Sequence, residues 1–225
     1  PREIINTGGV VKLPEHLPFD QAAIAEPLSC CLAAARAGRL GEGDSVLIIG
    51  AGPMGLLHLK VSLWHKAKVI VADVREDRLA MAGRMGATHC LNAGAVDVVT
   101  EVRRLTGGLG ADIVIASLGV PEVMERYLPA VRNGGTFNIF GGPPAGRPIS
   151  IDFRWIHYSE IVLTGTFAST PGDFRLALNL IGRGQIKVAD LISHRFHLDN
   201  MLEAVDLARR QEIIKGVLIM PGEEL

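Results

Sequence analysis

The chain has 225 residues, of which 48% are hydrophobic and 21% charged, and its formal net charge is −1. This charge balance argues against a nucleic-acid-binding protein, which needs a basic excess or a clustered basic face. The hydrophobic fraction is high enough for a folded core and excludes a chain that is disordered throughout. The most apolar stretch, residues 45–57, is interrupted by three glycines and a proline, so the sequence predicts no membrane span.

The three cysteines, Cys30, Cys31 and Cys90, follow neither a disulfide framework nor the spacing of zinc ligands. Such sparse thiols are typical of a reducing compartment. The opening residues lack the basic and then apolar pattern of a signal peptide. We therefore expect a cytoplasmic protein. The chain does not begin with Met, which is what we expect of a fragment or of a processed product.

Short apolar runs alternate with amphipathic stretches along the middle of the chain. Near-continuous apolar runs of this kind are typical of a parallel sheet covered on both faces. Between them, residues such as Met54, Leu57, Val61 and Trp64 recur at helical spacing, and residues 133–135 predict a turn before the fourth strand. Repeated strand–helix units predict an α/β fold with a doubly wound parallel sheet, the Rossmann architecture. The predicted strands are residues 46–49, 68–73, 113–116, 136–140 and 161–164.

The two ends of the chain lack this alternation. A helix is predicted to begin near Asp20, and from Pro171 the chain is predicted to be helical, with a further helix around 201–210 and a last strand at 216–220. We interpret the two ends as remnants of a second, catalytic lobe. The predicted division is residues 1–28 for the first remnant, 29–171 for the dinucleotide-binding domain and 172–225 for the return to the catalytic lobe.

A G-x-G-x-x-G pattern directly follows the first predicted strand and opens a helix. Gly50 allows the tight turn, Gly52 lets the backbone approach a pyrophosphate, and Gly55 permits close packing of the helix on the strand. The helix start, with Pro53 and Met54, offers unpaired N–H groups and a positive dipole end to the phosphates. The sequence therefore predicts a phosphate-binding turn. The alternative is a glycine-rich turn in an α/β domain that binds no cofactor.

An acidic residue, Asp73, ends the second predicted strand. Its carboxylate is placed to accept hydrogen bonds from both ribose hydroxyls and would repel a 2′-phosphate, so the sequence favours NAD over NADP. Arg75 and Arg78 leave NADP as an alternative cofactor, since a nearby arginine can bind a 2′-phosphate. With Asp73 present, we expect Arg78 to flank the adenine or the ribose.

Motifs spread along the chain narrow the class of enzyme. The Tyr-x-x-x-Lys pair of short-chain dehydrogenases is absent from the sequence. The informative segments are residues 11–14, 22–28, 41–46, 50–55, 133–135, 165–167 and 192–196. In this order they resemble the medium-chain alcohol and polyol dehydrogenases across essentially the whole chain. The pair Glu26-Pro27 is most similar to sorbitol dehydrogenases and related polyol enzymes.

This resemblance implies a zinc-dependent oxidoreductase that transfers hydride between a small alcohol or polyol and NAD. It also implies a homodimer or homotetramer that forms through edge strands of the cofactor sheet. It places Cys30, Phe140, Gly141 and Phe167 near the nicotinamide, with ordinary packing as the alternative for Cys30 and Phe167. Ala168 stands where many polyol enzymes carry an arginine, which weakens the case for a sorbitol-like substrate.

The resemblance implies that members of the family hold their zinc in a β-rich lobe through a cysteine and a Gly-His-Glu motif. No histidine in this sequence precedes a glutamate, and no pair of cysteines is spaced for zinc. Glu26 is the one zinc-associated residue that the resemblance retains, and a catalytic zinc needs three protein ligands. The sequence thus resembles the C-terminal two-thirds of such an enzyme, and we expect the chain alone neither to hold zinc nor to be active. No catalytic residue is assigned. The alternatives are a zinc-free NADPH-dependent medium-chain reductase, which Asp73 disfavours, and an NAD-binding sensor module.

Overall fold

The computed structural model describes residues 10–220, and the chain forms two compact units. One unit combines the chain up to Ser29 with the chain from Ser169 onwards, and the other is the continuous segment Cys30–Ala168. The outermost residues of the predicted segments 1–28 and 172–225 lie outside the described residues. The assignment of these segments to a catalytic lobe stays a prediction. No helix within residues 10–220 is both long and apolar enough to cross a membrane.

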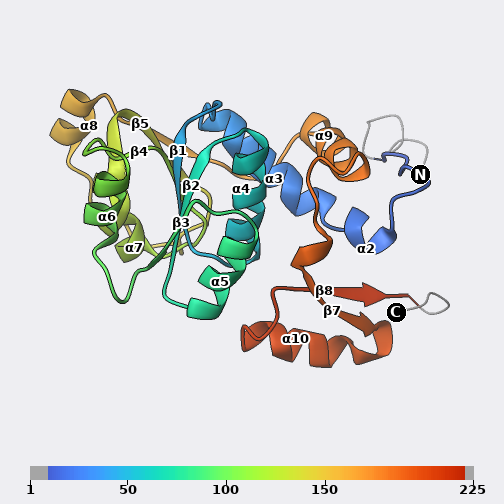
Figure 1. Cartoon of the computed structure of the whole chain (residues 1–225). Helices are drawn as coiled ribbons and strands as arrows, with labels where there is room; N and C mark the ends of the chain where they lie inside the picture. The colour runs from blue at the N-terminus through green and yellow to red at the C-terminus, as the bar shows by residue number, and fades with distance from the viewer. Residues whose placement is uncertain (1–9, 221–225) are drawn as a thin grey trace. The chain divides into compact units, whose positions relative to one another are not determined.

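The Cys30–Ala168 unit is built on a six-stranded parallel sheet with the strand order β3-β2-β1-β4-β5-β6 (Figure 1). This is the doubly wound order, which confirms the predicted α/β fold. The order reverses between β1 and β4, and ligands of such sheets bind outside the carboxyl ends of the strands at that point. The strands are β1 (Ser45–Ile49), β2 (Lys68–Asp73), β3 (His89–Asn92), β4 (Ala111–Ala116), β5 (Val131–Ile139) and β6 (Val162–Gly165).

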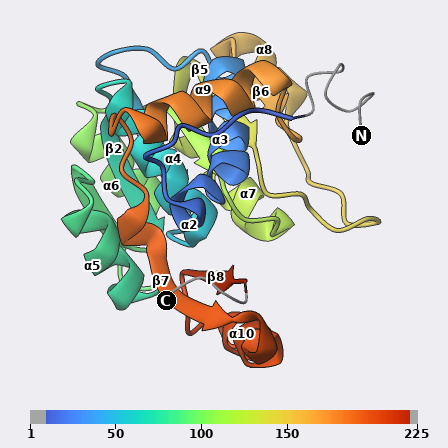
Figure 2. The ribbon, with the colours of Figure 1, turned by 90° about the vertical axis from the view of Figure 1, so that its right-hand side faces the viewer.

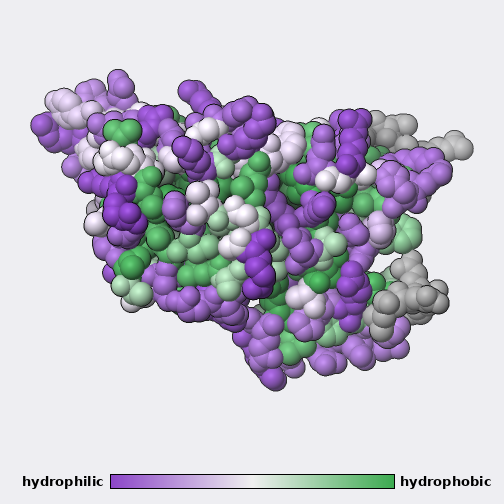
Figure 3. Space-filling view, in the orientation of Figure 1, coloured by the Kyte–Doolittle hydropathy of each residue, from purple (hydrophilic) through white to green (hydrophobic). Residues whose placement is uncertain are grey.

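Helices cover both faces of this sheet (Figure 1). One face carries α4 and α5. The other face carries α6, α7 and α8, and the apolar side chains of these three helices pack with those of the sheet into a buried cluster. Hydrophobic residues also reach the surface around the edge strand β3 (Figure 3). The helices of this unit are α3 (Ala25–Ala37, which begins in the other unit), α4 (Pro53–Trp64), α5 (Glu76–Arg84), α6 (Val98–Leu105), α7 (Pro121–Tyr127), the 3-10 helix η1 (Leu128–Ala130) and α8 (Phe153–Ser159).

Two features of the sheet differ from the sequence predictions. β3 was not predicted, because an edge strand with partly exposed side chains needs no apolar run. The predicted turn at residues 133–135 is wrong: these residues lie inside β5, where the pairing with β4 shifts register between Ala111 and Ile113. Gly134 has a φ of +71° there, so the glycines serve a bulge within the strand.

The other unit joins the two ends of the chain. A capping box at Thr170 and Asp173 starts α9, and the guanidinium of Arg195 pairs with Asp20 at 2.5 Å. The last strands pair in parallel, and α10 packs against them (Figure 2). The elements of this unit are α2 (Phe19–Ala22), α9 (Pro171–Gly182), η2 (Ala189–Leu191), β7 (Ile192–His197), η3 (Leu198–Asn200), α10 (Met201–Arg209) and β8 (Lys215–Ile219).

Candidate functional site

The glycine turn, residues 50–55, connects β1 to α4 at the carboxyl edge of the sheet. Gly50 has a φ of +95°, a conformation that L side chains rarely adopt, and its amide donates to the carbonyl of Ala72 at 2.8 Å. A Cβ at Gly55 would lie 1.8 Å from the carbonyl oxygen of Gly50. These two glycines are therefore required by the backbone itself, whether or not a ligand binds.

Gly52 is different, because the fold does not require it. It is the N-cap of α4 with a φ of −72°, and a Cβ there would meet only Nη1 of Arg78, at 3.6 Å. The space in front of Gly52 is thus open in the protein and would be filled by a side chain. Pro53 takes the first helical position, which suits a residue without an N–H, and Met54 follows it. The residues present fit the pyrophosphate of a dinucleotide at a helix N-terminus.

Asp73, at the end of β2, is held against this turn. Its Oδ2 accepts from the amide of Ala51 at 2.6 Å, and its Oδ1 accepts from the amide of Arg75 at 2.9 Å. Each carboxylate oxygen keeps a further lone pair, so the group can still accept from ribose hydroxyls. The contact of Asp73 with a ribose stays a prediction, and sequence reasoning missed its contact with the turn.

The two arginines after β2 have different surroundings. The guanidinium of Arg75 binds the carboxylate of Asp77 through Nε and Nη2, at 3.0 and 2.7 Å. The hydrogen bond from Arg75 lowers the pKa of Asp77 and raises that of Arg75. Arg78 instead brings its Nη1 close to Gly52. The structure therefore places Arg78 beside the glycine turn and ties Arg75 to an acidic neighbour.

Ser117, directly after β4, is a site residue that sequence reasoning missed. Its Oγ donates to the carbonyl of Ile49 at 2.6 Å and lies 3.1 Å from the carbonyl oxygen of Gly50. The hydroxyl thus fixes the glycine turn from the neighbouring strand across the point where the strand order reverses. The available signal was its position, one residue beyond an apolar strand.

The residues after β4 and β5 pack backbone against backbone. A Cβ at Gly119 would lie 2.1 Å from the carbonyl oxygen of Gly142, and one at Gly141 would lie 2.3 Å from the carbonyl carbon of Leu118. The amide of Gly141 also donates to the carbonyl of Ala116 at 2.8 Å. Gly141 therefore sits at the carboxyl edge, in a contact that a larger residue would break.

Phe140 packs edge-to-face on the imidazole of His58, with 4.3 Å between the ring centroids. His58 lies on α4 and is 1% exposed, and burial lowers its pKa from 6.5 to about 3. The imidazole is therefore neutral near pH 7. This contact fixes the ring of Phe140 one helical turn beyond the glycine turn.

The remaining predicted residues lie apart from this cluster in the chain. Phe167 follows β6 and is fully exposed, and Ala168 after it has a φ of +60°. Cys30 is half-buried on α3. Glu26, in the first turn of α3, belongs to the other unit and is exposed. The roles predicted for these residues stay predictions.

The part of the chain that the structure describes offers no set of ligands for a zinc ion. No three His, Cys, Asp or Glu side chains come together there in a way that could hold a metal ion. The described residues do not fit a catalytic zinc, and we derive no chemical step through one.

The chain matches the sequence profile of a family described as zinc-binding dehydrogenase, over residues 53–183. It is 31% identical to D-arabitol-phosphate dehydrogenase of Enterococcus avium and 30% identical to sorbitol dehydrogenase 1 of Saccharomyces cerevisiae. Each match covers 94% of this chain and 61% of the relative. The chain thus spans about three-fifths of the length of these curated relatives.

Solved structures of similar fold include alcohol dehydrogenase TADH from Thermus sp. ATN1, with a TM-score of 0.89 and 28% identity over 93% of this chain and 61% of that one. A structure described as a zinc-binding dehydrogenase from Sinorhizobium meliloti, bound to NADP, has a TM-score of 0.86 and 29% identity. It matches over 93% of this chain and 62% of its own.

Proposed function

Because the chain belongs to the zinc-binding dehydrogenase family, we propose that it is the dinucleotide-binding part of an oxidoreductase that transfers hydride between an alcohol or polyol and NAD. The resemblance to medium-chain alcohol and polyol dehydrogenases is confirmed by the family match and the relatives. The activity, the substrate and the partners of the whole protein are part of the proposal, since the chain spans 61% of those relatives.

The open space at Gly52 is the observation that carries this proposal. Gly50 and Gly55 are explained by the backbone alone, whereas Gly52 has room for a side chain and carries none. A pyrophosphate on the N–H groups of α4 needs that room. Arg78 beside Gly52 adds positive charge where the phosphates would lie.

NAD, when bound, supplies the hydride acceptor. The residues of this chain bind and orient it. The turn with Gly52, Pro53 and Met54 holds the phosphates, and Asp73 accepts from the ribose. Phe140 and Gly141, at the carboxyl ends of the sheet, lie at the nicotinamide side, and we place Phe167 there as well. The fixed ring of Phe140 gives that side an apolar wall that keeps water from the reacting carbon.

NAD is proposed over NADP on charge grounds. The carboxylate of Asp73 is fixed at the strand end, where it would repel a 2′-phosphate, and Arg75 is occupied by Asp77. The Sinorhizobium meliloti relative bound to NADP shows that the family fold also accepts the phosphorylated cofactor. The direct comparison of the two cofactors is therefore part of the test.

The rest of the proposal follows the family. The substrate is a small alcohol or polyol, as the names of the relatives indicate for those proteins. Zinc belongs to the family, and Glu26 is proposed to lie at or near it, with its further ligands outside the described residues. We further propose a cytoplasmic homodimer or homotetramer that forms through the edge of the cofactor sheet.

Calorimetric titration of the chain with NAD and with NADP tests the proposal. We expect saturable binding of NAD and at least a hundredfold loss of affinity in Gly52→Val, because the side chain takes the space of the pyrophosphate. Circular dichroism of Gly52→Val should match the wild type. Gly172→Val is the matched control, since a Cβ at Gly172 meets only an ordinary contact of 3.5 Å in the other unit. Unchanged NAD affinity in Gly52→Val would remove the phosphate-binding role from the turn.

A further inference from the structure

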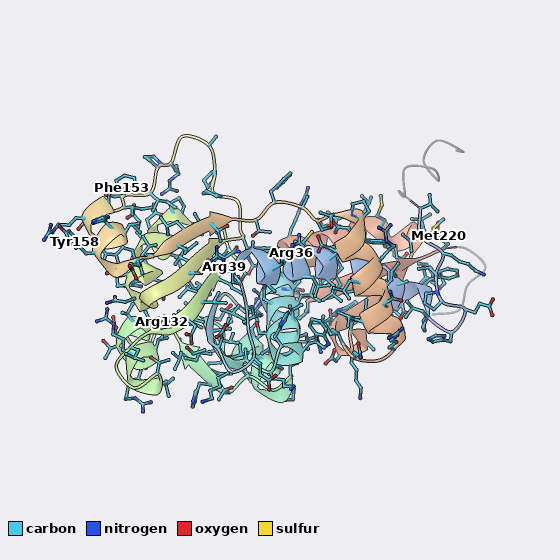
Figure 4. The ribbon with its side chains drawn as sticks, turned by 90° about the horizontal axis from the view of Figure 1, so that it is seen from above. Arg36, Arg39, Arg132, Phe153, Tyr158 and Met220 are labelled. Carbon is cyan, nitrogen blue, oxygen red and sulfur yellow. The ribbon has the colours of Figure 1, made fainter. Side chains whose placement is uncertain are left out.

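A cavity of about 360 Å³ lies at the amino edge of the six-stranded sheet, opposite the glycine turn. Residues at the starts of five parallel strands line it: Ser45 of β1, Lys68 of β2, His89 of β3, Asp112 of β4 and Arg132 of β5. Leu105, the last residue of α6, and the loop of residues 106–110 form a further part of the wall. Arg132 is labelled near the start of β5 in Figure 4. Small-molecule sites begin at about this volume.

The negative charge of Asp112, the acidic residue of this cavity, is offset by its hydrogen-bond donors. Oδ2 of Asp112 accepts from the amide and the hydroxyl of Ser45, at 2.8 and 2.6 Å, and Oδ1 accepts from Nε of Arg132 at 2.5 Å. Burial alone would raise the pKa of Asp112, but the bonds from Ser45 and the charge of Arg132 lower it on balance. Asp112 is therefore a carboxylate whose charge Arg132 offsets.

Two cationic donors at the cavity remain available. Among the described residues, the ammonium group of Lys68 makes no ion pair or hydrogen bond. The guanidinium of Arg132 uses Nε for Asp112 and Nη1 for the carbonyl of Asn133, at 2.7 Å, which leaves the two hydrogens of Nη2 without an acceptor. Because the charges of Asp112 and Arg132 offset each other, the cavity keeps the positive charge of Lys68.

The helix dipole opposes an anion here only weakly. α6 ends at this edge, and helix C-termini carry partial negative charge on their last carbonyls. Two of the last four carbonyls of α6 accept hydrogen bonds from the following residues: Thr106 donates to the carbonyl of Val102, and Gly108 donates to that of Arg103. A full charge on Lys68 therefore determines the sign of the site.

Part of the cavity wall is apolar. Ile70, Leu105 and Leu109 line it, and Leu109 is 70% exposed. An inorganic ion would leave this surface uncovered, whereas a ligand with a carbon body would bury it. The wall thus combines two cationic donors with an apolar surface.

We propose that this cavity is a second ligand site, for a small organic anion whose carboxylate or phosphate group binds Lys68 and Nη2 of Arg132 while its carbon body covers Leu105 and Leu109. The site is separate from the glycine turn, because it lies at the opposite ends of the same strands. It therefore does not depend on the proposed dinucleotide function.

Backbone amide NMR with benzoate, phenyl phosphate and uncharged benzamide tests the site at constant ionic strength. We expect saturable shifts of the amides of residues 106–110 with both anions, and at least tenfold weaker shifts with benzamide. Benzoate and phenyl phosphate separate carboxylate from phosphate as the preferred group. Shifts confined to the amides of Ala51, Gly52, Met54 and Gly55 would mean that the anion binds at the helix N-terminus of α4 and would overturn the proposal.

Lys68→Gln should weaken the binding of both anions about fivefold, as the loss of one charge-assisted contact predicts. Lys187→Gln, which removes the same charge from an exposed position in the other unit, should leave it unchanged. The absence of saturable shifts at residues 106–110, equal binding of benzamide, or unchanged binding in Lys68→Gln would each overturn the proposal.

Discussion

The two edges of the parallel sheet are built in different ways. At the carboxyl edge, backbone makes the site: three glycines and the start of α4 form the turn, and Asp73 and Ser117 fix it by hydrogen bonds to main-chain atoms. At the amino edge, side chains from five strands make the cavity. A site made of backbone is encoded in adjacent residues, whereas a site made of side chains exists only once the strands are in register.

The two edges also differ in electrostatics. Helix starts face the carboxyl edge, where unpaired N–H groups attract an anion and Arg78 adds its charge beside Gly52. Helix ends face the amino edge, so an anion can be held there only by full charges such as those of Lys68 and Arg132. Binding of a pyrophosphate at the carboxyl edge should therefore depend chiefly on the size of the residues in the turn, and binding of an anion at the amino edge on the charge of the side chains.

Among the changes at the carboxyl edge, Gly55→Val should lower the stability of the fold most. Its Cβ would lie 1.8 Å from a backbone oxygen that cannot move without displacing β1, so we expect a loss of about 3 kcal/mol or more in the free energy of unfolding. Urea denaturation measures this loss. Gly52→Ala is the control and should change the free energy of unfolding by less than about 1 kcal/mol, since its Cβ has room. Equal losses would contradict the distinction between the two glycines.

His58 should give the carboxyl edge a pH-dependent stability. Its pKa is lowered by burial to about 3, so between about pH 6.5 and 3 the unfolded chain binds a proton that the folded chain does not. Stability is therefore lost as the pH falls, by about 2 kcal/mol from this group between pH 7 and 5.

Urea denaturation at pH 7 and pH 5 checks the role of His58. His58→Leu should lose about 2 kcal/mol less stability than the wild type over this interval. His197→Leu, at an exposed position, is the control and should behave as the wild type does. The same loss in His58→Leu and in the wild type would show that His58 takes up its proton in the folded state.

Asp73→Asn sharpens the role of charge at the carboxyl edge. The amide keeps one oxygen that can accept from Ala51 but loses the charge that repels a 2′-phosphate, so the affinity for NADP relative to NAD should rise about tenfold. Calorimetric titration with both cofactors measures the ratio, and thermal unfolding shows whether the turn is intact. An unchanged ratio in a folded variant would mean that Asp73 serves the turn alone.

Asp77→Ala should have the smallest effect. The change removes one negative charge beside Arg75 and so makes this end of β2 more positive, and the affinity for NADP relative to NAD should rise about threefold. The double variant Arg75→Gln/Asp77→Ala should return the ratio to its original value. A rise that persists in the double variant would trace the effect to something other than Arg75.

Periodicity and local motifs predicted those parts of the molecule that adjacent residues encode. The apolar runs identified β1, β2, β4, β5 and β6, and the G-x-G-x-x-G pattern identified the turn. β3 was missed because its four residues are partly exposed at an edge.

Contacts between distant residues could not be predicted in the same way. Ser117 lies 2.6 Å from the carbonyl oxygen of Ile49 only because β4 pairs with β1 in one register. The cavity that joins Lys68 to Arg132 depends on the order of five strands, which no local pattern specifies.

Backbone amide NMR during titration with NAD tests the central claim most directly. We predict shifts at the amides of Ala51, Gly52 and Met54 and of Ser117, while the amides of residues 106–110 at the amino edge stay in place. The four responding amides follow the two strands between which the strand order reverses. Saturable shifts confined to the amino edge, or no shifts at residues 51–55 at millimolar NAD, would contradict the account.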